Sequence, residues 1–267
     1  MEDEQKKSLL KTYAVPILIG FVGLGALALQ NDKTAQSATV SNTDYDALAE
    51  QVMPSDGVEL PVVWGDLGRQ LVDSGAIDRE KWMELYRERT DEEERLLDGS
   101  SQEKLRITRE NASYLLNLFW AFGLANANPI LEDKTEMMNP QFGGAGGFAS
   151  TGGWTLSDGD SMNHYGMHAL VQLTKEQQAL VDRISRGVYR PCCDNSTHFP
   201  DCNHGMAMLG LLELMASQGA SEEEMWDAAL AVNSYWFPDT YETIALYKKQ
   251  KGIEWSDVDP REVLGKD

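Results

Sequence analysis

The stretch "CNHGMAMLGLLELMASQG", residues Cys202–Gly219, decides the fold of this protein. Apolar residues fill most of it, and Glu213 is the only Asp, Glu, Lys or Arg residue within it. A helix that is apolar on nearly all sides is stable only when other parts of the protein cover all of those sides. The sequence therefore predicts that this segment is the central buried helix of the domain.

Start and stop signals for further helices lie on both sides of that segment. Ser221 with Glu224 and Thr174 with Gln177 have the spacing of capping boxes, in which two side chains satisfy free N–H groups at a helix start. Asp239 with Glu242 predicts a third start, and Asp78 a fourth. Further helices are expected over residues 64–75, 79–97, 107–128, 175–189, 224–237 and 240–252.

Strand signals are weak by comparison. We find no set of alternating apolar segments separated by Asn-Gly or Asp-Gly turns. The Gly- and Ser-rich segment from Pro140 to Ser161 lacks the lysine of a phosphate-binding loop, so an irregular loop is expected there. The predicted fold class is all-α, with a single helical domain and one long Gly-rich loop.

The N-terminal segment predicts a membrane association. Three lysines, Lys6, Lys7 and Lys11, precede an uncharged apolar run from Ala14 to Leu29. This run is close to the lower limit of about 17 residues for a membrane-spanning helix, and basic residues mark the cytoplasmic side. We expect a signal or membrane anchor over residues 1–29, a polar linker over 30–43 and the helical domain over 44–267. The protein is then a single-pass protein of the cell membrane whose C-terminal domain is extracytoplasmic, or it is secreted if the N-terminal segment is cleaved.

Composition excludes one class of partner. The chain has 43 acidic and 23 basic residues, a formal charge of −20 at pH 7. A strongly negative protein repels the phosphates of nucleic acid, so nucleic-acid binding is excluded. The partners expected are the membrane, through the N-terminal segment, and another protein of the cell envelope.

All three cysteines and all four histidines lie between positions 164 and 204. His164 and His168 are four residues apart, so on a helix their rings would share one face. The glutamate of the H-E-x-x-H zinc-peptidase motif is missing between them. Cys202 is expected in the first turn of the central helix, capped by Asp201, where the helix dipole favours the thiolate.

These residue types favour a transition-metal site. Thiolate and imidazole bind zinc, copper and iron, and thiolates with nearby thioethers favour Cu(I), which places copper ahead of zinc. Zinc prefers four ligands, and Cys192, Cys193, Cys202 and His204 would supply that number. The C-x-x-C spacing of standard zinc motifs is absent, however, and adjacent cysteines rarely bind one tetrahedral ion together, which argues against a simple Cys3His zinc site. Covalently bound haem is excluded because the sequence has no C-x-x-C-H motif. A four-cysteine iron–sulfur cluster is excluded because the chain has only three cysteines. The candidate metal ligands are Cys192, Cys193, Cys202, His204, His164 and His168.

Two alternatives stay open at this point. In the first, the protein is an enzyme of the cell envelope, with Cys202 as a thiol-redox centre or nucleophile activated by His204. In the second, a disulfide from Cys202 to Cys192 or Cys193 staples a loop of a structural or interaction module, as disulfides commonly do in exported proteins.

Overall fold

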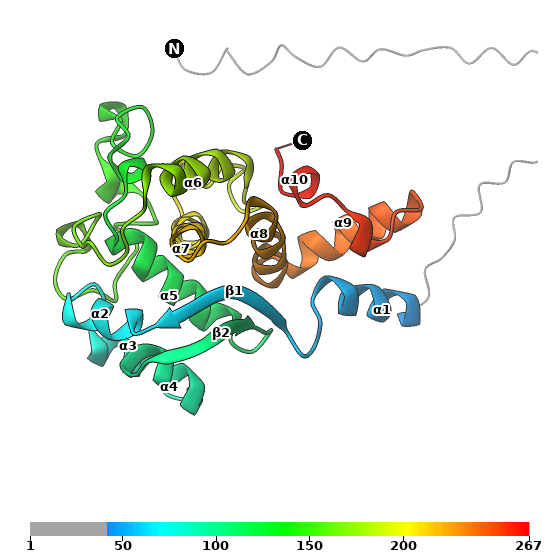
Figure 1. Cartoon of the computed structure of the whole chain (residues 1–267), viewed down its shortest axis with the longest axis horizontal. Coiled ribbons are helices and arrows are strands. Elements are labelled where there is room, and N and C mark those ends of the chain that lie inside the picture. Colours follow the sequence, from blue (N-terminus) through cyan, green and yellow to red (C-terminus); the bar gives the residue numbers. More distant parts are fainter. Residues whose placement is uncertain (1–41, 267) are drawn as a thin grey trace, which may run out of the picture. The chain divides into compact units, whose positions relative to one another are not determined.

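The computed structural model describes residues 42–266, a helix-rich domain with ten α-helices and one two-stranded antiparallel sheet (Figure 1). The helices and strands are α1 Asn42–Val52, β1 Val58–Gly65, α2 Leu67–Asp73, α3 Arg79–Leu85, α4 Asp91–Asp98, β2 Ser101–Ile107, α5 Ala112–Ala125, α6 Lys175–Gly187, α7 Asn203–Ser217, α8 Glu222–Trp236, α9 Pro238–Gln250 and α10 Pro260–Val263. Short 3-10 turns are η1 Pro129–Glu132, η2 Pro140–Phe142, η3 Ala145–Gly147, η4 Ser161–Asn163 and η5 Trp255–Asp257.

The central position predicted for α7 is confirmed. Every residue of α7 from Gly205 to Ala216 is buried, because α5, α6, α8 and β1 pack around it. Figure 1 shows α7 between α6 on one side and α5 with the β1–β2 sheet on the other. Burial of such an apolar helix is favourable at about 25 cal/mol per Å² of surface removed from water, so α7 organises the core.

Two glycines let α5 and α7 cross at backbone contact. A Cβ atom on Gly123 would lie 2.2 Å from the carbonyl oxygen of Met206, and one on Gly210 would lie 2.6 Å from that of Phe119. No side chain fits at those distances, so only glycine permits this crossing. The close approach fixes the position of α7 relative to α5.

Most predicted helix starts are confirmed. The capping boxes at Thr174 and Ser221 are both present, and the Asp78 side chain accepts hydrogen bonds from the backbone at the start of α3. The start predicted at Asp239 is wrong, since α9 begins at Pro238. Proline lacks an N–H group and has a helix-like φ, so it suits the first position of a helix.

The fold class all-α is correct only in part, because β1 and β2 form an antiparallel two-stranded sheet that the sequence pattern did not reveal. Leu60, Val62 and Trp64 alternate into the core along β1, but Pro61 interrupts the strand signal. The two strands are joined through α2, α3 and α4 rather than by a tight turn. Two antiparallel strands that are not joined by a short turn lack the local sequence signature of a β-hairpin.

The segment that carries His164 and His168 is also different from the prediction. It is not helical: the 3-10 turn η4 ends at Asn163, and Gly166 has a φ of +64°. A left-handed residue interrupts any right-handed helix. Within the predicted helix over 79–97, residues around Thr90 separate α3 from α4, and Thr90 with Glu93 forms a capping box of its own.

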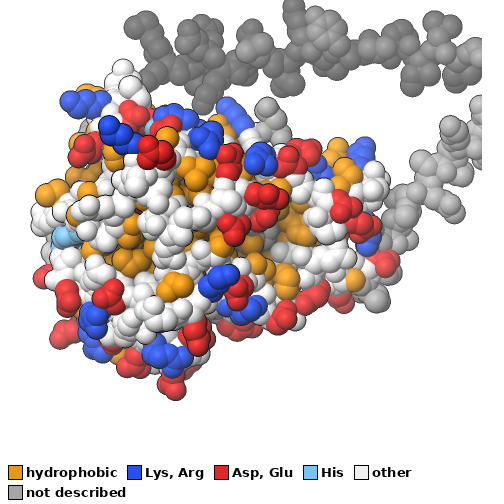
Figure 2. All heavy atoms as spheres, viewed as in Figure 1, with side chains coloured by type: hydrophobic (Ala, Val, Ile, Leu, Met, Phe, Trp, Pro, Cys, Tyr) orange, Lys and Arg blue, Asp and Glu red, His pale blue; other side chains and the backbone are white. Residues whose placement is uncertain are grey.

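The predicted anchor and almost all of the predicted linker lie outside the described residues. Helix α1 begins at Asn42. Among the helices that the structure describes, none combines the length and the apolar character needed to cross a membrane. On the face shown in Figure 2, acidic and basic side chains are interspersed with hydrophobic ones, so the charge is dispersed over this surface.

Candidate metal centre

The three cysteines converge into one thiol cluster, which we define as Cys192, Cys193 and Cys202. Their sulfur atoms are separated by 3.5 Å (192–193), 3.6 Å (192–202) and 3.8 Å (193–202), and all three are free thiols. Two sulfurs bound at about 2.3 Å to one tetrahedral ion are separated by about 3.8 Å. The cluster therefore has nearly the size of one face of a metal–thiolate site.

Helix α7 supplies one of the three sulfurs. Cys202 is the N-cap of α7, and its Sγ accepts a hydrogen bond from the N–H of Gly205 at 3.4 Å. The cap expected at Asp201 is therefore one residue later. A side chain at the N-cap is close to the free N–H groups and the positive end of the helix dipole, which favour a thiolate.

A tight turn supplies the other two sulfurs. The N–H groups of Cys193 and Asp194 both donate to the carbonyl of Arg190, at 3.3 and 3.0 Å. Asp194 has a φ of +55°, a left-handed conformation that aspartate tolerates better than most residues. This turn presents both adjacent thiols toward the N-terminus of α7.

Arg190 is buried beside the thiol cluster and fixes the loop around it. Its guanidinium donates to Asp201 Oδ1 at 2.5 Å, to the carbonyl of Phe199 at 3.1 Å and to Cys193 Sγ at 3.3 Å, and also to the carbonyl of Ser196. Its side chain is fully inaccessible to solvent. A buried charge is tolerated when it is paired and hydrogen-bonded in this way.

Gly205 makes room for that guanidinium. A Cβ atom on Gly205 would lie 2.6 Å from Arg190 Cζ. Any larger residue at position 205 would displace the arginine. The sequence "CNHGM" (Cys202–Met206) therefore combines a thiol cap with the space for a cation beneath it.

The surroundings of Cys202 lower the pKa of its thiol to about 3. The largest cause is the hydrogen bond from Cys192, and further contributions come from His204, from the charge of Arg190 and from the N–H of Gly205. The same contact raises the pKa of Cys192, since its proton is shared with the Cys202 sulfur. The metal-free cluster thus holds its first negative charge on Cys202, stabilised by neighbouring protons.

His204 lies next to the cluster rather than within it. Its hydrogen bond to Cys202 contributes to the low pKa of that thiol, while its ring packs against Phe237 at a centroid distance of 4.4 Å. Its Nδ1 atom has no hydrogen-bond partner among the described residues. His204 can therefore orient Cys202, and it is the nearest imidazole from which a fourth ligand can come.

Within the described residues, the cysteines are the only group of three or more His, Cys, Asp or Glu side chains whose ligand atoms lie within 4.8 Å of one another. His164 and His168 are not among them. They contact each other, with His164 Nδ1 3.2 Å from His168 Nε2, and the backbone of His168 bridges to Asn126 at the end of α5. The structure thus places these two predicted ligands together, but apart from the thiols.

The position of Asn126 sets the separation of the two groups. Its side chain donates to Glu213 at 2.5 Å, and Glu213 is eleven residues beyond Cys202 on α7. At 1.5 Å per residue, that is about 16 Å along the helix. One ion cannot be shared over such a distance, so the thiol cluster and the histidine pair are separate places in the fold.

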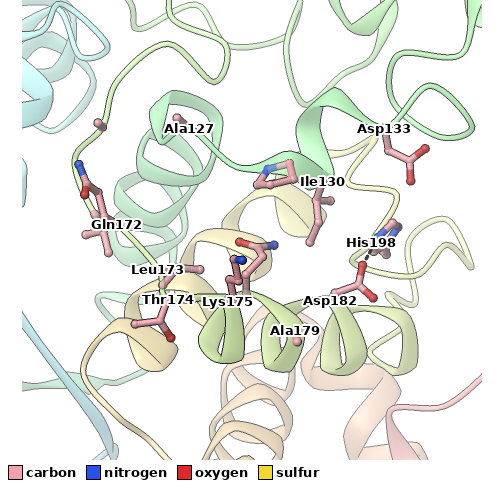
Figure 3. Close-up of a pocket in the computed structure, with 14 residues that line it drawn as sticks. Ala127, Ile130, Asp133, Gln172, Leu173, Thr174, Lys175, Ala179, Asp182 and His198 are labelled. Atoms are coloured by element: carbon pink, nitrogen blue, oxygen red, sulfur yellow. Dashed lines mark hydrogen bonds and ion pairs between the residues drawn. The ribbon is translucent and has the colours of Figure 1, made fainter.

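The fourth histidine lines a different hollow. His198 is buried, and its Nε2 atom is 2.9 Å from Asp182 Oδ1 and 2.8 Å from Arg186 on α6. A cleft of about 880 Å³ opens beside His198 and Asp182. Figure 3 shows these two side chains pointing toward each other among the residues that line the cleft. Asp133 and Lys175 also line the cleft, which the thiol cluster does not enter. His198 therefore holds the cysteine-bearing loop against α6, and it is not a candidate ligand for a metal ion at the thiol cluster.

Sequence reasoning missed Arg190 and Gly205. A basic residue directly before "PCC" and a glycine in the first turn of an apolar helix are present in the sequence, but neither is a metal-ligand signal. Of the nearby methionines, Met206 and Met208 are fully buried core residues, whereas Met162 and Met167 are exposed. Buried thioethers inside a helix usually fill the core.

Comparison of the chain with protein-family models, with curated proteins and with solved structures gives no match. The chemistry of the site therefore carries the functional argument.

Proposed function

We propose that this protein binds a soft transition-metal ion through Cys192, Cys193 and Cys202. The observation that carries the proposal is the convergence of three free sulfurs within 3.8 Å of one another at the N-terminus of a buried helix. Thiolates are the protein ligands that Cu(I) and zinc prefer. Arg190 and the helix N-terminus supply positive charge that favours the anionic sulfurs this binding needs.

Copper is proposed ahead of zinc, as Cu(I). Among the described residues, three sulfurs converge here and no His, Asp or Glu ligand atom joins them. A structural zinc site is four-coordinate, and here zinc would need either His204 to turn toward the cluster or a water molecule. Three thiolates form a complete set for a soft monovalent ion and leave His204 as a neighbour that orients Cys202.

The location we propose follows from the N-terminal sequence, with residues 1–29 as signal or anchor and the domain outside the cytoplasm. A metal bound to the cluster would also keep its three closely spaced thiols reduced there, since disulfides form readily in oxidising compartments. The metal and the location are thus mutually consistent. A protein of the cell envelope that delivers or receives the ion is the partner this implies.

Metal analysis of untagged, full-length protein tests the proposal. After anaerobic reconstitution with Cu(I) or Zn²⁺ and removal of free metal, we expect close to one equivalent bound at the thiol cluster. The triple variant C192S/C193S/C202S should lose that equivalent, whereas R183M, at an exposed position of α6 outside the cluster, should keep it. Less than a tenth of an equivalent in the unmodified protein, with thiol titration showing all three cysteines reduced, would refute metal binding.

A thiol–disulfide exchange function is the second candidate, and one distance favours it. Cys192 and Cys202 have sulfurs 3.6 Å apart, and Cys192 is exposed whereas Cys202 is the stabilised thiolate. In this reaction the Cys202 thiolate attacks a disulfide of a partner protein, which forms a mixed disulfide and releases one partner thiol. Cys192 then loses its proton and attacks the mixed disulfide, which leaves a Cys192–Cys202 disulfide and releases the second partner thiol.

The redox candidate has its own readout. The equilibrium between the dithiol and the disulfide in glutathione buffers gives a reduction potential for the Cys192–Cys202 pair. A potential as high as those of catalytic disulfides, together with no metal retained, would favour exchange over metal binding. A pair that stays reduced throughout and binds copper would exclude it.

A further inference from the structure

The histidine pair, His164 and His168, is not used by the function proposed above. The pair lies on a segment fixed to the end of α5: the N–H groups of Gly166 and His168 donate to the carbonyls of Leu124 and Ala125 at 2.7 and 2.9 Å. Those are carbonyls of the last turn of a helix, which carries partial negative charge and favours cations nearby. The segment that carries the two rings is therefore held at a helix end where a positive ion is electrostatically favoured.

The tautomer of His164 follows from its second nitrogen. His164 Nε2 is 2.9 Å from the carbonyl oxygen of Asp158. A carbonyl only accepts, so in the neutral ring Nε2 carries the proton and Nδ1 keeps its lone pair. This Nδ1 faces His168 Nε2 at 3.2 Å. A histidine whose far N–H is held by a carbonyl is the arrangement that orients metal-binding imidazoles.

Gly75 seats the His164 ring in this orientation. It has a φ of +79°, and a Cβ atom there would lie 3.1 Å from His164 Cε1 and 3.4 Å from Asp158 Cβ. The glycine thus allows the ring and Asp158 to close over the turn between α2 and α3. His164 is buried and His168 is partly buried, so one ring is fixed and the other borders solvent.

The separation of the facing nitrogens fits a shared ion. Two imidazole nitrogens at about 2.0–2.1 Å from one ion lie about 3.3 Å apart when the coordination is tetrahedral and about 2.9 Å apart when it is octahedral. The observed 3.2 Å lies in that range. A tautomeric change that moves the His168 proton to Nδ1, without net loss of a proton, frees both lone pairs, and a rotation of the less buried His168 ring then directs both at one ion.

We propose that His164 Nδ1 and His168 Nε2 form a second metal site, independent of the thiol cluster, for a divalent ion that prefers imidazole, namely Zn²⁺, Cu²⁺ or Ni²⁺. Solvent fills the remaining positions, so the site is open. Burial and the neighbouring His164 lower the pKa of His168, which disfavours a proton on that ring. This site does not depend on whether the cysteines bind metal.

Titration of the full-length C192S/C193S/C202S variant with Zn²⁺ tests this second site. We expect one equivalent bound, seen by calorimetry and by changes in the side-chain nitrogen NMR signals of two histidines. H168Q in that background should weaken binding at least tenfold, whereas H204Q should leave it unchanged. Far-UV circular dichroism checks folding, and H168Q is preferred to H164Q because His168 is the less buried residue.

The outcomes separate the two proposals. Absence of Zn²⁺, Cu²⁺ and Ni²⁺ binding in the cysteine-free variant, or equal affinity in its H168Q form, would overturn the histidine site and leave the thiol site unaffected. Retention of one equivalent by the cysteine-free variant, with no copper bound by the thiols of the unmodified protein, would do the reverse. NMR changes confined to His198 and His204 would also contradict the histidine site.

Discussion

The thiol cluster and the histidine pair are neighbours in sequence but lie in opposite local fields. The thiols meet at the N-terminus of α7 beside a buried arginine, where positive charge stabilises anionic sulfur. The histidine segment is bound to the C-terminus of α5, where carbonyl groups favour a cation. The fold therefore divides one sequence cluster into two sites, each with ligands suited to the helix end that it occupies.

Loss of Arg190 should produce the largest effect and should act on the thiol side only. In R190M, Asp201 loses its ion-pair partner at 2.5 Å and keeps the hydrogen bond from Asn195, and three further hydrogen bonds of the loop disappear. We expect the free energy of unfolding to fall by about 3 kcal/mol, because a largely buried carboxylate is left without a neutralising charge. Urea denaturation measures this.

The matched control is R183M, which removes an exposed ion pair with Glu222. Its effect should stay below about 1 kcal/mol. Equal losses in the two variants would mean that Arg190 does not hold the cysteine-bearing loop. Zn²⁺ affinity of the histidine pair should be the same in both variants, and a change there would break the division into two sites.

The substitution C202S comes next. Serine is a good N-cap, so α7 should keep its start. The copper affinity should nevertheless fall roughly a hundredfold or more, because loss of a ligand costs at least as much as loss of a residue that orients one. Competition with a Cu(I) chelator measures the affinity, and an affinity within a few-fold of the unmodified protein would mean that Cys202 is no ligand.

The pH dependence of thiol reactivity distinguishes the sulfurs from one another. Since the pKa of Cys202 is lowered to about 3, its thiolate should persist in acid. Its alkylation rate should therefore change little between roughly pH 5 and pH 8, a range over which the alkylation rate of an ordinary thiol rises steadily. Cys192, whose pKa is raised, should stay unreactive over this range. Mass spectrometry of the metal-free protein gives both rates, and a Cys202 rate that rises tenfold per pH unit would contradict the assignment.

The same pKa fixes the sign of a stability effect. A thiol with a lowered folded-state pKa stabilises the protein above its unfolded pKa of about 8.5. That contribution is lost progressively as the pH falls toward about 3. The unmodified protein should therefore lose stability relative to C202S over this range. A stability difference that does not vary with pH would contradict the assignment.

The smallest effect is expected for G75A, on the histidine side. Gly75 and Gly219 have nearly the same φ, +79° and +81°, but only at Gly75 would a Cβ atom meet another group, the His164 ring. Both alanine variants should lose about 1 kcal/mol from backbone strain. Only G75A should also weaken Zn²⁺ binding in the cysteine-free protein, by a few-fold, because it displaces His164. Equal Zn²⁺ affinities would show that Gly75 does not position this ring.

Local signals were enough to predict much of the helical core. The uniform apolar character of α7 predicted its burial, and the capping boxes at Thr174 and Ser221 predicted the starts of α6 and α8. Convergence of three cysteines near one helix start also followed from spacing, since Cys202 lies only nine residues beyond Cys193.

The remainder depends on contacts between distant parts of the chain. The pairing of β1 with β2 spans three helices, and Pro61 interrupts the strand pattern. Gly75 precedes α5 in the sequence and His164 follows it, so no local sequence pattern predicts their contact. His164 and His168 do come together as their spacing suggests, but through a left-handed turn at Gly166 rather than a helix.

The burial of α7 has a consequence for how long the protein survives in the cell. Metal at its N-cap would hold the folded state and not the unfolded chain, and a ligand present at a thousand times its dissociation constant adds about 4 kcal/mol to stability. Proteases cut the transiently opened chain, so a metal-starved population would be degraded sooner. Abundance of the protein would then report the supply of its ion without any separate sensor.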